Sequence, residues 1–98
     1  MKQSPNDSKR YQTVTLDNGL RVLLIQNTHS EKSAAALAVN VGHFNDPKNR
    51  QGLAHFLEHM LFLGTERYPD GSEYQKFISQ YGGNNNAWTS TEHTCFFF

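Results

Sequence analysis

The sequence has 98 residues, 37% of them hydrophobic and 18% charged, and its nine basic residues balance nine acidic ones. This length is at the small end for one domain, so we expect a single core. A net charge of zero gives no sign of a surface for nucleic acid. No stretch approaches the roughly 18 consecutive apolar residues of a membrane-spanning helix. We therefore predict no nucleic-acid partner and no membrane association.

The first ten residues are polar and contain no apolar signal sequence, so we expect residues 1–10 to form a flexible lead-in. The single cysteine, Cys95, cannot form an internal disulfide, which permits a reducing compartment. We expect a cytoplasmic protein, with the periplasm or another compartment left open.

Two runs rich in Val, Leu, Ile and Thr, Tyr11–Leu16 and Leu20–Gln26, are joined by Asp17-Asn18-Gly19. This pattern predicts a β-hairpin, because Asn-Gly accepts the positive φ angles of tight hairpin turns. Residues 34–41 alternate apolar with small or polar side chains, which predicts a third strand ending at Gly42.

Asn45-Asp46-Pro47 supplies a capping side chain and a proline suited to a first helical turn. We therefore predict a helix from this point through Leu63, with Gly64 at its end. Most of its side chains are apolar, so we expect almost all of this helix to be buried.

A second helix is predicted to open at Ser72, where Gln75 can complete a capping box, and to stop at Gly82-Gly83. The segments Asn85–Thr89 and Thr91–Phe98 are rich in residues that favour strands, and we expect both to be extended.

His55, Glu58 and His59 form the pattern His-x-x-Glu-His inside the first predicted helix. Residues four apart on a helix share a face, so both imidazoles can reach one metal ion. Two imidazole nitrogens suit zinc, whose catalytic sites use three protein ligands and leave a fourth position for water. Glu58 shares this face without needing to be a ligand, so it can act as general base for the water. This order of residues is the inverted zincin motif, and it predicts Zn²⁺ as cofactor.

The alternative is that these three residues share a helix face by chance and have structural roles. The helix is otherwise apolar, however, and burying three ionisable groups without a partner would be costly. A purely structural zinc module would need four ligands, commonly cysteines, and the sequence contains one cysteine.

On a wider set of residues the sequence resembles the pitrilysin and insulin-degrading enzyme family of zinc peptidases. The matching segments are Asp17–Leu24, Gly52–Thr65, Tyr68-Pro69 and Asn86–Thr94. The resemblance implies an α+β fold, an antiparallel sheet with helices packed on one face. It implies that residues 11–98 are the incomplete N-terminal part of a zinc metallopeptidase domain in a longer chain. It also implies that His55 and His59 bind zinc and that Glu58 is the base.

The resemblance extends to the substrate. Residues 85–89 match the edge strand beside the metal, where the backbone of a peptide substrate adds as a further strand. Asn86 and Ala87 are the residues we expect to make these contacts. The alternative is an ordinary strand of the sheet with Trp88 in the core.

In the family the third zinc ligand is a glutamate on a later helix, and Glu66, Glu73 and Glu92 do not match its position. We therefore expect a zinc-dependent endopeptidase of peptides whose site needs the remainder of its own longer chain. The 98 residues alone should be inactive or nearly so. The alternative is a non-catalytic supporting subunit related to the mitochondrial processing peptidases. Such subunits generally lose the motif residues, and all three are present here.

Overall fold

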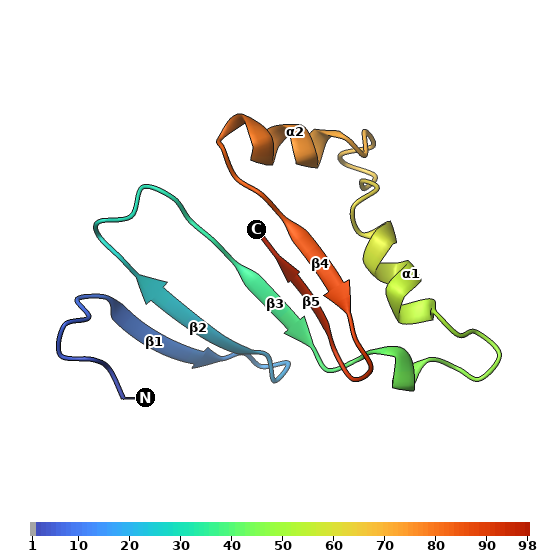
Figure 1. The fold of residues 1–98 in the computed structure, drawn as a ribbon, viewed down its shortest axis with the longest axis horizontal. Helices are drawn as coiled ribbons and strands as arrows, with labels where there is room; N and C mark the ends of the chain where they lie inside the picture. Colours follow the sequence, from blue (N-terminus) through green and yellow to red (C-terminus); the bar gives the residue numbers. More distant parts are fainter. Residues whose placement is uncertain (1) are drawn as a thin grey trace. The chain divides into compact units, whose positions relative to one another are not determined.

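The computed structural model describes residues 2–98, which fall into two compact units (Figure 1). The first unit extends to Ser33 and the second comprises Ala34–Phe98. The first contains one hairpin, and the second contains a three-stranded sheet and two α-helices. The predicted α+β class is confirmed.

The first unit is the predicted hairpin. Strand β1 (Arg10–Thr15) pairs with antiparallel β2 (Arg21–Gln26), and Thr15 lies opposite Arg21. The turn differs from the expected tight Asn-Gly turn. Gly19 has a φ of 83°, but the φ of Asn18 is not positive, since no residue other than glycine has a positive φ in the described part of the chain. The Gly19 N–H donates to the Leu16 carbonyl (2.8 Å), and the Leu16 N–H donates to the Leu20 carbonyl (2.9 Å). The loop is therefore a turn followed by a glycine bulge, in which Gly19 alone takes the left-handed conformation.

The second unit is built on an antiparallel sheet in the order β3-β5-β4. Its strands are β3 (Ala36–Val39), β4 (Asn86–Thr89) and β5 (Thr94–Phe97), and β5 lies in the centre. Reciprocal hydrogen bonds between Ala35 and Phe98 (2.9 and 3.0 Å) extend the β3–β5 ladder by one pair. Strand β4 pairs only with β5 in the described sheet, so it has a free edge.

The first predicted helix is much shorter than expected. A 3₁₀ turn, η1 (His43–Asn45), comes first, and α1 spans only Leu53–Met60. Asp46 caps this helix across the intervening loop: its carboxylate accepts the N–H groups of Gly52 (2.7 Å) and Ala54 (2.9 Å). These bonds, that from Ala54 above all, lower the pKa of the Asp46 carboxyl. Pro47 therefore stands in a loop, and Asp46 caps a helix that begins seven residues later, at Leu53.

The second helix, α2 (Glu73–Gln80), begins and ends where it was predicted, and Gly82 follows it with a φ of 67°. The predicted capping box is wrong. The Ser72 hydroxyl and N–H both donate to Asp70 (2.6 and 2.8 Å), and with Lys76 they lower the pKa of Asp70 to about 2. Gln75 instead forms two reciprocal amide hydrogen bonds with Asn85 (both 2.9 Å), which join α2 to the segment leading into β4.

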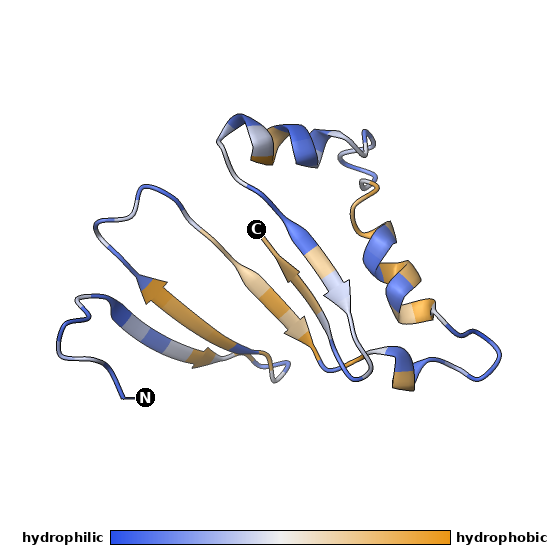
Figure 2. Ribbon diagram, in the orientation of Figure 1, coloured by the Kyte–Doolittle hydropathy of each residue, from blue (hydrophilic) through white to orange (hydrophobic). Residues whose placement is uncertain are grey.

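No hydrophobic residue in the described part of the chain is buried, although β3 and much of α1 are apolar (Figure 2). The prediction that almost all of the first helix is buried is wrong, because the main contacts of α1 are with β4, β5 and η1 along one side. Its other sides, including Phe56 (62% exposed) and Leu57 (57% exposed), are uncovered. No helix among residues 2–98 combines the length and apolar character needed to cross a membrane.

Candidate metal and catalytic site

Helix α1 brings its two histidines together. His55 and His59 are one turn apart, and their rings lie 4.7 Å apart between centroids. The two Nε2 atoms face each other at 2.9 Å. Both side chains are exposed, so an ion can reach them from solvent.

This separation fits one zinc ion. Zinc lies about 2.0–2.1 Å from imidazole nitrogen, so a tetrahedral ion would hold two such nitrogens about 3.3 Å apart. Opening the observed 2.9 Å by a few tenths of an ångström requires only small side-chain rotations. Two lone pairs directed at a common point are what a cation needs. The alternative, a hydrogen bond between two neutral imidazoles, would require one to donate and one to accept.

Glu58 lies on the same helix but in a different environment. It is the buried residue of α1, at 8% exposure, and its Oε2 accepts a hydrogen bond from the Thr89 hydroxyl of β4 (2.7 Å). No group of three His, Cys, Asp or Glu side chains that could hold a metal is found among residues 2–98. The described site therefore offers two facing imidazoles and a buried carboxylate that is hydrogen-bonded to β4.

Half-buried Thr89 lies next to a buried threonine of β5. Thr94, 6% exposed, is the β5 residue opposite Thr89, and it donates to the Val41 carbonyl (2.8 Å). The two threonine oxygens are 3.4 Å apart. Sequence reasoning missed both residues, because nothing in the local pattern pairs Glu58 with a residue 31 positions later.

The predicted substrate residues lie on β4, the edge strand. Hydrogen-bonded pairs alternate with non-hydrogen-bonded pairs along an antiparallel ladder. The Ser90 N–H donates to the His93 carbonyl (2.8 Å), so the alternation turns the backbone of Asn86 toward β5 and that of Ala87 toward the free edge. The Ala87 N–H is satisfied there by the Asn86 side-chain oxygen (2.9 Å). That these residues bind substrate stays a prediction.

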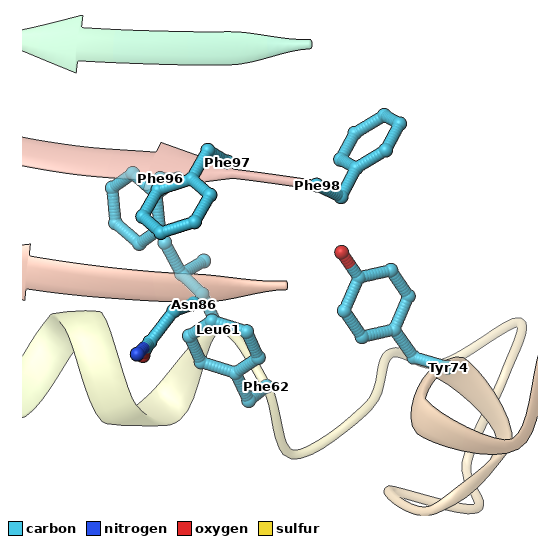
Figure 3. A pocket seen from close by; sticks show the side chains of 7 residues that line it. All are labelled: Leu61, Phe62, Tyr74, Asn86, Phe96, Phe97 and Phe98. Atoms are coloured by element: carbon cyan, nitrogen blue, oxygen red, sulfur yellow. The ribbon is translucent and has the colours of Figure 1, made fainter. Parts of the chain in front are cut away.

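The alternative for this strand placed Trp88 in the core. Trp88 is instead 44% exposed, and its ring meets the edge of the His93 ring at a centroid distance of 4.9 Å. An apolar cavity of about 150 Å³ lies where β4 begins (Figure 3). The residues that line it come from the segment after α1, from α2, from the start of β4 and from β5 with the residue after it. They are Leu61, Phe62, Tyr74, Asn86, Phe96, Phe97 and Phe98.

The chain is similar to known proteins of one peptidase family. The sequence profile of the insulinase family (peptidase family M16) matches residues 21–98. Human insulin-degrading enzyme is 50% identical over 96 residues, which are 98% of this chain and 9% of that protein. A Caenorhabditis elegans protein named as a zinc protease is 51% identical over 92 residues, 94% of this chain and 11% of that protein.

The crystal structure of pitrilysin superposes with a TM-score of 0.87 at 41% identity, over 98% of this chain and 10% of that chain. This chain thus spans about a tenth of the length of the relatives it matches. The match to pitrilysin extends over the hairpin of the first unit and over the strands and helices of the second. The chain belongs to the insulinase family of peptidases.

Proposed function

We propose that this chain carries two zinc ligands and the general base of a zinc-dependent endopeptidase that cleaves peptides. His55 and His59 hold the metal and Glu58 is the base. The observation that carries the proposal is the 2.9 Å approach of the two Nε2 atoms, with Glu58 on the same helix. The remainder of a longer chain supplies the third ligand.

The chemistry divides between the metal and the chain. Zinc, when bound, is a Lewis acid that polarises the peptide carbonyl and makes a water molecule acidic near neutral pH. Glu58 accepts the proton of the attacking water on Oε1, since its Oε2 is engaged by Thr89. The same carboxyl then returns the proton to the amine that leaves.

The free edge of β4 can align the substrate. A peptide in extended conformation would pair with the outward backbone groups of Ala87, displacing the Asn86 side-chain oxygen from its N–H. Asn86 can then hydrogen-bond to the peptide through its amide. Main-chain pairing of this kind favours flexible peptides over folded proteins.

The test is cleavage of an unstructured peptide of a few tens of residues by the full-length protein containing this sequence. Chelation should abolish cleavage, and added zinc should restore it. Glu58→Gln should lower kcat by about 10²-fold to 10⁴-fold, the usual contribution of general acid–base catalysis, without loss of bound zinc. Glu66→Gln is the matched control, because Glu66 is exposed and lies outside the site; it should cleave normally.

Two results would contradict the proposal. Normal cleavage by Glu58→Gln would remove Glu58 from the mechanism. A folded, zinc-loaded full-length protein that cleaves no peptide would favour a non-catalytic supporting subunit.

A further inference from the structure

We propose that Thr89 is a positioning residue for Glu58, and that its hydroxyl holds the carboxylate in the orientation in which Oε1 meets the attacking water. This inference rests on the proposed function of Glu58. It concerns a residue on β4 that contacts the base from 31 positions away in the sequence.

The proposed base is buried and needs a hydrogen-bond donor. Glu58 is 8% exposed, whereas the histidines on either side of it are exposed. A buried carboxylate needs hydrogen-bond donors, because water reaches it poorly. The Thr89 hydroxyl is the donor for Oε2 at 2.7 Å, a distance typical of a hydrogen bond from a hydroxyl to a charged oxygen.

The Thr89 hydroxyl proton is free to point at Glu58. Thr94 donates its own proton to the Val41 carbonyl at 2.8 Å, and its oxygen is 3.4 Å from that of Thr89. A hydroxyl carries a single proton, so Thr89 can give its proton to Glu58 while Thr94 remains tied to the backbone. The bond from Thr89 to Glu58 is the shorter of the two contacts that Thr89 makes.

The sheet supports Thr89 on a paired strand. Thr89 lies in β4 opposite Thr94 of β5, the central strand, and α1 packs on both strands. Thr89 is β-branched, which restricts its side chain to few rotamers. One carboxylate oxygen is therefore fixed to the sheet and the other is left for chemistry. A displacement of a catalytic group by about 1 Å can lower the rate by about 10²-fold.

The experiment compares five forms of the full-length protein: wild type, Thr89→Val, Thr89→Ser, Glu58→Gln and the double variant of Thr89→Val with Glu58→Gln. Valine keeps the shape of threonine and removes the donor. Thr89→Val should lower kcat by about 10-fold to 100-fold with KM and zinc content unchanged, and Thr89→Ser should restore most of the loss. In the Glu58→Gln background, Thr89→Val should change kcat by less than about 2-fold, because residues that act as a unit are not additive.

Thr13→Val is the matched control, since Thr13 is an exposed threonine of β1; it should leave kcat unchanged. If Thr89→Val lowers the unfolding temperature too far for assay, Thr89→Ala against Thr89→Ser makes the same comparison of the hydroxyl. Wild-type kcat in Thr89→Val, or an equal loss in both backgrounds, would overturn the inference. If Glu58→Gln loses activity while Thr89→Val keeps it, the proposed function stands and only the inference about Thr89 fails. Normal activity in Glu58→Gln would refute the proposed function itself.

Discussion

Asp46 acts at the start of α1 although it lies outside the helix. Its two carboxylate oxygens accept the N–H groups of Gly52 and Ala54, which have no partner within the helix. A negative charge at this end also interacts favourably with the helix dipole. The hydrogen bonds favour the ionised carboxyl, and they, the bond from Ala54 above all, lower its pKa below the ordinary value of 3.8. Asp46 therefore orients the helix that carries His55, Glu58 and His59.

This predicts a pH-dependent effect of Asp46→Ala on stability. Because the folded-state pKa is lowered, the stabilisation is complete above the ordinary pKa and is lost as pH falls through the folded pKa. Asp46→Ala should lower the thermal midpoint of the full-length protein at pH 7, and the difference from wild type should shrink below about pH 4. The measurement is thermal unfolding at a series of pH values. Asp17→Ala, in the hairpin turn, is the control. If Asp46→Ala lowered the thermal midpoint by the same amount at every pH, the capping role would be contradicted.

The residues of the site differed in how far the sequence could predict them. The spacing of His55 and His59 places them on one helix face whatever else the fold does, and the structure brings their Nε2 atoms together. Thr89 could not be found in this way. Its contact with Glu58 depends on the pairing of β4 with β5 and on the packing of α1, which no local pattern encodes.

Among the elements, η1 is fixed by the close approach of a glycine to the β4–β5 turn. The Gly42 N–H donates to the Asn45 side chain (3.0 Å), and the N–H groups of His43 and Phe44 donate to Ser90 and Thr91 (2.9 and 2.8 Å). A methyl group on Gly42 would overlap the Ser90 carbonyl oxygen and lie 2.7 Å from the Glu92 nitrogen. These are backbone atoms, so the clash cannot be relieved by a side chain alone.

Gly42→Ala should therefore destabilise the protein by about 1–3 kcal/mol, the usual cost of overpacking, and should weaken zinc binding by moving the segment that leads into α1. Denaturant unfolding and zinc titration of the full-length protein measure the two effects. Gly19→Asn is the control: nothing lies within 4 Å of its added atom, and asparagine tolerates the left-handed conformation. Equal stability of Gly42→Ala and wild type would show that the turn moves freely.

Element positions were predicted better than their boundaries. The glycines at 19 and 82 mark real turns, because both adopt positive φ. The apolar run through Leu63 suggested a longer helix than Leu53–Met60, because hydrophobic residues continue past the point where the helical hydrogen bonds end. The capping box at Gln75 failed because that side chain has a stronger partner in Asn85, ten residues away.

At the scale of the whole chain, residues 2–98 form secondary structure, but no hydrophobic residue among them is buried. The buried residues other than glycine in the described part of the chain are Glu58 and Thr94, both polar. Leu23, Leu24 and Ile25 of β2 are each about half exposed or more, at 48%, 50% and 54%. Burial of apolar surface is the main favourable contribution to folding, at about 25 cal/mol per Å². The strands and α1 thus present exposed apolar surface.

We predict that the isolated 98-residue chain unfolds without a cooperative transition and binds hydrophobic dyes. The full-length protein should unfold in a cooperative transition and should bind no hydrophobic dye below its unfolding temperature. A domain of this size with a complete core would unfold with a heat-capacity change of about 1.2–1.5 kcal/mol/K, and the isolated chain should fall well short of it. Calorimetry and dye fluorescence on both proteins make the comparison. A sharp transition of full heat capacity in the isolated chain would mean that its apolar faces close on one another. The zinc ligands would then stand on an independent domain, and the remainder of the protein would be needed only for the third ligand and the substrate.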